Sequence, residues 1–218
     1  MQPDRSRLSD ASPLNGWMLT GLVSLAVSLT ALGIAAAHQF DVDGMRAVIR
    51  ATARTSLLLF CLAFSAAALH RLWPHAWTRW QRRNRRYLGV AFAVSHGVHA
   101  IAIVCLVRVA PELLATVASP DMLIFGGIGY GFIAAMAATS FDRTAALIGA
   151  RAWRILHLTG GWYIWLSFVN AFGKRTGEHP AYWGFVALLI VLLALRIIAW
   201  RRASRVDAPA DGRRRLAA

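Results

Sequence analysis

Long apolar runs dominate this chain, and short segments rich in arginine, proline or acidic residues separate them. A helix crosses the hydrocarbon core of a bilayer in about 20 residues. Runs of this length without strict alternation are not typical of barrel strands. The pattern therefore predicts an all-α, polytopic membrane protein in which residues 16–200 form a six-helix transmembrane bundle. The predicted spans are residues 17–37, 52–70, 87–107, 122–141, 155–173 and 182–200.

The first two runs need separate interpretation. The first resembles a secretory signal, but its apolar stretch is longer than is usual for a signal and Asp4 and Asp10 interrupt the basic start. We expect it to stay in the protein as a span. The second run is the shortest, because its fully apolar part covers only about residues 55–69.

Composition excludes the main soluble alternatives. Hydrophobic residues make up 57% of the 218, charged residues only 16%, and yet the formal net charge is +14. A soluble domain needs more polar surface than this, and a disordered basic chain does not carry nine tryptophans. Because the charge can be explained by membrane topology, no nucleic-acid partner is expected.

The distribution of basic residues predicts the orientation. With six spans both termini share one side, and 17 basic residues fall on that side against six on the other. Positive residues collect in the cytoplasm, so the expected topology is N-in/C-in in the inner membrane. Residues 1–15 are then a cytoplasmic N-terminus and residues 201–218 a basic, disordered tail. The tail and the cluster at 79–86 would contact anionic lipid, and Arg196 would snorkel from the last span to the inner face.

Four histidines are the candidate functional residues. His96, His99 and His157 lie within predicted spans, and His70 lies at the inner end of the second. An ionisable residue inside a span is a functional candidate, and imidazole is a common axial ligand of haem iron in helical bundles. The alternative is that these rings make interhelical hydrogen bonds, for which hydroxyl side chains are available in the spans. Spacing alone does not separate the two.

Glycines gather in the fourth span and after His157. Gly127 and Gly131 form a small-xxx-small pair, while Gly160 and Gly161 lie one turn beyond His157. Small residues let helices approach closely, which is the structural role expected for them.

Three stretches resemble the ferric reductase-like transmembrane domain. They are Thr-Ala-Arg-Thr-Ser-Leu at 52–57 with Arg71 beyond it, Arg-Arg-Tyr-Leu-Gly at 85–89 followed by His99, and Trp-Arg-Ile-Leu-His at 153–157. The similarity covers roughly residues 40–200 in order and spacing. It is strongest to the small bacterial branch that includes the membrane haem subunit of the methionine-sulfoxide reductase system.

The resemblance implies a b-type haem between the third and fifth spans, with His99 and His157 as axial ligands. It implies electron flow from a cytoplasmic flavin or an NAD(P)H-linked donor to a periplasmic redox partner protein, and Arg85 and Arg86 are linked to flavin at the inner face. Family members carry a second histidine on the fifth span, thirteen residues after the first. Here that position is Asn170.

Depth along the helices makes this departure important. At 1.5 Å per residue, His99 and Asn170 lie about 20 and 24 Å above the arginines that open their spans, whereas His157 lies only about 4 Å above. We therefore expect His99 to face position 170 rather than His157. His70 lies at the depth of His157 and is a possible partner for an inner haem. His96 is either a substitute ligand or a hydrogen bonder.

Two classes of function follow from the sequence. One is a membrane haem protein that transfers electrons only, with substrate chemistry on a partner. The other is a haem-less, degenerate member of the family that acts as a membrane anchor or assembly partner, which Asn170 favours. A six-helix transporter is a weaker third reading, because no inverted repeat or broken pair of helices stands out.

Overall fold

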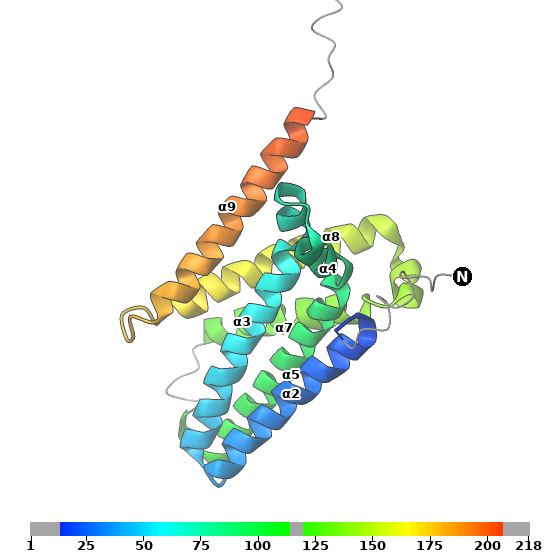
Figure 1. Cartoon of the computed structure of the whole chain (residues 1–218). Coiled ribbons are helices and arrows are strands. Elements are labelled where there is room, and N and C mark those ends of the chain that lie inside the picture. Colours follow the sequence, from blue (N-terminus) through cyan, green and yellow to red (C-terminus); the bar gives the residue numbers. More distant parts are fainter. Residues whose placement is uncertain (1–13, 114–119, 207–218) are drawn as a thin grey trace, which may run out of the picture.

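The computed structural model describes residues 14–113 and 120–206, and this part of the chain contains seven helices and no strand (Figure 1). The all-α prediction is confirmed for these residues. The helices are α2 (Gly16–Ala37), α3 (Val42–Leu72), α4 (Ala76–Arg83), α5 (Arg85–Val109), α7 (Pro120–Ala138), α8 (Asp142–Gly173) and α9 (Tyr182–Val206). Most of the predicted N-terminus and of the tail lies outside the described residues.

Four of the helices, α2, α3, α5 and α9, are each long and apolar enough to cross a membrane. A fifth candidate arises if α7 and α8, which meet at a bend of 115°, are counted as one span. These four to five apolar helices are consistent with a multi-pass membrane protein, while the count of six spans and their orientation stay predictions.

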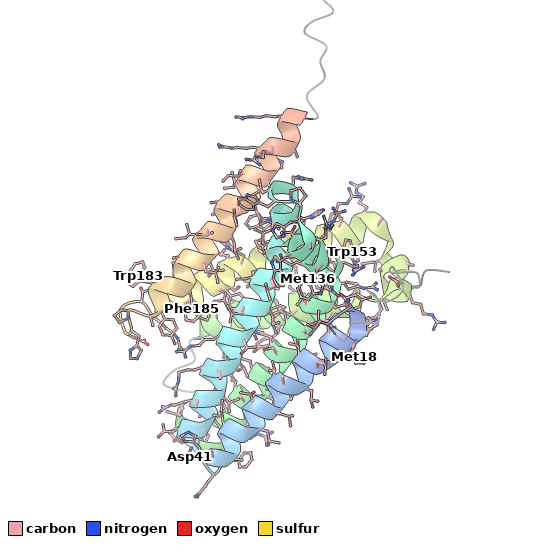
Figure 2. The ribbon with its side chains drawn as sticks, in the orientation of Figure 1. Met18, Asp41, Met136, Trp153, Trp183 and Phe185 are labelled. Atoms are coloured by element: carbon pink, nitrogen blue, oxygen red, sulfur yellow. The ribbon has the colours of Figure 1, made fainter. Side chains whose placement is uncertain are left out.

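Helix ends differ from the predicted spans where local capping decides them. α3 begins ten residues earlier than expected, because the Asp41 side chain accepts a hydrogen bond of 2.7 Å from the Gly44 backbone N–H and caps the helix (Figure 2). α9 continues six residues beyond 200 into the predicted disordered tail. Arginines near a helix C-terminus interact favourably with its dipole, which accounts for this extension.

The short helix α4 was not predicted, because its buried face is polar. Thr78, Gln81 and Asn84 recur at helical spacing, and all three are almost fully buried. Gln81 Nε2 donates to the Leu62 carbonyl at 2.8 Å, and Asn84 Oδ1 accepts from the Gly16 backbone N–H at 2.9 Å. Amides thus hold the basic α4 segment against α3 and α2.

Helix α3 is the centre of the bundle, in contact with α2, α4, α5 and α9 (Figure 1). At its seam with α5, Ser56 and Ser95 are fully buried and their hydroxyl oxygens lie 2.9 Å apart. Beside them Phe60 packs against Phe92 of α5 and Phe168 of α8, with ring centroids 5.7 and 5.5 Å away. This aromatic cluster joins the α8 side of the molecule to the α3–α5 seam.

Helices α7 and α8 pack antiparallel on each other. Trp153 Nε1 donates to the Thr139 carbonyl at 3.0 Å near the turn, and Tyr163 Oη donates to the Phe125 carbonyl at 2.8 Å farther along. Gly149, with φ of 75°, breaks the regular geometry of α8, so its first two turns run in a different direction from the remainder.

The glycines divide into packed and open positions. An added Cβ at Gly160 would lie 2.9 Å from the Met136 sulfur and 3.0 Å from a ring carbon of Phe132, so Gly160 lets α7 approach α8. No heavy atom lies within 4 Å of a Cβ added at Gly127 or Gly131. The close approach expected for that pair is therefore not made within the described chain.

We expect Gly160→Val to lower the melting temperature of the detergent-purified protein, because overpacking a tight contact costs about 1–3 kcal/mol. Gly126→Val is the matched control, since nothing lies within 4 Å of its Cβ position. Thermal unfolding measured by circular dichroism tests this. Equal melting temperatures for the two variants would contradict the described α7–α8 contact.

Candidate functional site

A cavity of about 240 Å³ opens between α3, α5, α7 and α8, at the end of the bundle where α5 begins. Its wall is mainly apolar and aromatic, and Figure 2 labels two of its residues, Met136 and Trp153. The polar residues of the wall are Arg85, Arg86, Thr139, Ser140, Asp142 and His157. The cavity thus combines a hydrophobic interior with basic groups and one imidazole.

Two contacts orient His157 on this wall. Its ring stacks on Trp153, one helical turn earlier, with centroids 4.2 Å apart. Its Nε2 lies 3.2 Å from Thr139 Oγ1 across the α7–α8 contact. The ring is therefore fixed by two neighbours, and Thr139 occupies one of its nitrogens.

The two arginines of the wall are in different electrostatic situations. Arg86 pairs with Asp142 at the start of α8, and its guanidinium lies 5.2 Å from the ring of Tyr87. Arg85 has no carboxylate partner among the described residues. The cavity therefore carries one positive charge that no carboxylate of the described residues neutralises.

His99 and His96 form a second polar cluster, farther along α5. His99 Nδ1 lies 3.1 Å from both the Ile49 carbonyl oxygen and Thr52 Oγ1 of α3. Its ring stacks on His96, whose ring lies 5.0 Å from that of Tyr130 on α7. In the described chain, His96 Nδ1 and Tyr130 Oη are buried and have no hydrogen-bond partner.

The expectation that position 170 faces His99 is not met. Asn170 is exposed, and Phe168 is the α8 residue that reaches this cluster, with its ring 6.1 Å from that of His96. Two residues correspond to a rotation of about 200° around a helix, so Asn170 and Phe168 face opposite ways. Counting residues along the helices predicted the level at which α8 meets this cluster. It did not predict which face of α8 points toward the cluster.

His70 and His157 are also not brought together. His70 Nδ1 lies 3.3 Å from Thr78 Oγ1 on the α4 side of α3, whereas His157 faces α7 and the cavity. His70 is not part of the cavity wall. The proposed pairing of these histidines for an inner haem finds no support here.

The sequence predicted that the Arg196 side chain snorkels from α9 to the inner face. The structure places it elsewhere. Its Nη1 donates to the Phe64 carbonyl at 2.7 Å, and its guanidinium lies 4.0 Å from the Phe64 ring centroid. Phe64 lies two turns before the end of α3, so the side chain points along the bundle and away from the basic end. The Phe64 carbonyl and ring give the Arg196 guanidinium contacts that lipid hydrocarbon could not provide.

The donor sets limit the chemistry that this part of the chain can perform. No group of three or more His, Cys, Asp or Glu side chains could hold a metal ion within the described residues. A metal bound to one or two imidazoles within a larger organic group is compatible with the observed geometry. The inner cavity fits such a group best, because its wall supplies an imidazole, apolar surface and an unneutralised arginine.

Comparison with known proteins gives no match to a family model, a curated protein or a solved structure. The resemblance to the ferric reductase-like family therefore rests on the short sequence stretches alone and stays a prediction. Two of these stretches, at 85–89 and 153–157, meet at the inner cavity, and the third, at 52–57, contains the Thr52 that contacts His99.

We expect neutral His99 to carry its proton on Nδ1, because the Ile49 carbonyl can only accept a hydrogen bond. The ¹⁵N spectrum of histidine-labelled protein in lipid, assigned with a His99→Gln variant, reports this tautomer. Thr52→Val should leave it unchanged, since the Ile49 carbonyl remains. A proton on Nε2 would contradict the hydrogen bond.

Proposed function

We propose that this chain is a membrane electron-transfer protein that holds a b-type haem in the inner cavity with His157 as an axial ligand. The observation that carries the proposal is the meeting of His157, Arg85 and an aromatic wall around one space. Haem iron supplies reversible one-electron chemistry when bound. The chain itself binds and orients the group, and substrate chemistry belongs to a partner.

Each part of the wall has a role in this proposal. The aromatic and aliphatic side chains provide the low-polarity surroundings that a porphyrin requires. Arg85, which has no carboxylate partner in the described chain, matches a propionate. His157 would exchange its contact with Thr139 for iron, and Trp153 would keep its ring in place. The wall offers one imidazole, so we propose a single protein ligand at this position.

His99 is the candidate for a second, outer haem. A hydrogen bond from Nδ1 to a backbone carbonyl leaves Nε2 with its lone pair, which is the usual arrangement behind a metal-bound histidine. His96 stacks on the same ring and is the alternative ligand.

We also propose six spans with both termini in the cytoplasm of a cell with an inner membrane. The antiparallel contacts of α7 with α8 support counting them as two crossings. The end of the bundle where α3 and α9 finish and α5 starts is rich in arginine, which supports its cytoplasmic position. Electrons would then enter from a cytoplasmic flavin or NAD(P)H-linked donor near Arg85 and Arg86 and leave to a periplasmic redox partner.

A haem-less membrane anchor or assembly partner is the second candidate. The observation in its favour is the missing second ligand, since Asn170 is exposed and Phe168 lies against His96 instead.

We expect the purified protein, expressed with haem precursor, to show a b-type absorption spectrum that sharpens on reduction with dithionite. His157→Ala should remove most of the inner-haem signal, because no other imidazole lines the cavity. The matched control is His70→Ala, which should leave the spectrum unchanged, and His99→Ala tests for the outer haem. A colourless wild-type preparation would favour the anchor.

The topology proposal predicts the activity of alkaline phosphatase fusions, because this enzyme forms its disulfides and folds only outside the cytoplasm. Fusions after Glu112 and Gly177 should be active, and fusions after Ser140 and Val206 inactive. Activity after Ser140 would contradict the separate crossings of α7 and α8. Activity after Val206 would reverse the orientation.

A further inference from the structure

A second hollow lies on the other side of Phe64, between α3, α8 and α9, with a volume of about 480 Å³. Its wall is mostly hydrophobic but contains two arginines and two tryptophans. The residues that matter are Arg71, Arg196, Leu158, Trp162, Ile197 and Trp200. We call this hollow the α3–α9 groove.

The two guanidinium groups of the groove are only partly satisfied. Arg196 donates to the Phe64 carbonyl, but its buried Nε has no hydrogen-bond partner in the described chain. Arg71 Nη1 reaches the Ala199 carbonyl at the long distance of 3.4 Å. Neither side chain pairs with a carboxylate among the described residues. The groove therefore holds two positive charges and no compensating negative charge from the described residues.

The level of the two arginines along the helices determines which part of a lipid they can contact. Arg71 lies in the last turn of α3, and Arg196 lies three residues before Ala199, which Arg71 contacts. Trp200 is 66% exposed beside them, as is common for tryptophan at a membrane interface. Leu158 and Ile197 are also exposed. Arg71 thus lies near one end of the bundle, Arg196 lies deeper, and an open apolar wall lies beside them.

We propose that the α3–α9 groove binds one anionic phospholipid, with its phosphate between Arg71 and Arg196 and its acyl chains along the apolar wall. A negatively charged headgroup supplies the missing countercharge, and phosphate oxygens suit guanidinium donors. A zwitterionic lipid fits less well, because its ammonium group would face two cations with no carboxylate nearby. A hydrated phosphate ion gains nothing from the apolar wall.

The site is independent of the haem proposal. The groove and the inner cavity border different sides of α8, because His157 and Gly161 line the cavity whereas Leu158 and Trp162 line the groove. Phe64 and Trp162, in edge contact at 5.3 Å, lie between the two spaces. A colourless protein would therefore still bind the lipid.

The test is native mass spectrometry of the full chain in micelles containing equal amounts of phosphatidylglycerol and phosphatidylcholine with identical acyl chains. We expect one retained phosphatidylglycerol. Arg71→Gln and Arg196→Gln should each lower the preference over phosphatidylcholine about fivefold, the effect of about 1 kcal/mol per arginine. Arg50→Gln, a charge-matched change at an exposed position of α3 outside the groove wall, should leave the preference unchanged.

Several outcomes would overturn the proposal. These are equal retention of the two lipids by the wild type, an unchanged preference in Arg71→Gln, or an equal loss in Arg50→Gln. If Arg196→Gln does not fold, Arg71→Gln decides alone, since within the described residues Arg71 makes only one long hydrogen bond. Inorganic phosphate added to the same micelles should not displace the lipid; displacement would identify a free-anion site instead.

Discussion

Hydrocarbon offers no hydrogen-bond partner, and this constraint governs the α3–α5 seam on which the rest of the bundle is assembled. Ser56 meets Ser95 there, and His99 meets the Ile49 carbonyl and Thr52. The same need for internal partners explains why amides, rather than apolar side chains, attach α4. The polar groups inside the bundle therefore specify which helices touch and at which level.

Charged side chains inside the bundle find partners within the protein less completely than the uncharged polar groups do. Arg86 has Asp142, but Arg85 and Arg196 have no acidic partner in the described chain. Backbone carbonyls and aromatic rings make such positions tolerable, as the contacts of Arg196 with Phe64 show. Unneutralised arginines of this kind are costly in a membrane and are the natural places to expect an anionic partner. Both proposed ligands are anionic: a haem carries carboxylates, and an acidic lipid carries a phosphate.

Phe64 connects the two proposed sites. Its ring lines the inner cavity, lies under the guanidinium of Arg196 and meets Trp162 edge-on. Its ring therefore borders both proposed sites and separates them. Gly161, whose added Cβ would lie 3.5 Å from the Phe64 ring, gives that ring its space.

The sequence by itself determined the all-helical class, the approximate positions of the apolar helices and the concentration of arginine at one end. These features depend on the local hydrophobicity and charge of each segment, because each segment enters or avoids the bilayer according to its own composition. It also identified His99, His157, Arg85 and Arg86 as candidate site residues. The structure places His157, Arg85 and Arg86 on one cavity wall, and His99 farther along α5 against α3. Rotation about the helix axes was decided only by tertiary packing. Depth along a helix can be counted from the sequence, but the direction of a side chain depends on the neighbours that the helix meets. For that reason Asn170 faces away from His99, His70 turns to α4, and Arg196 binds the Phe64 carbonyl rather than reaching the surface.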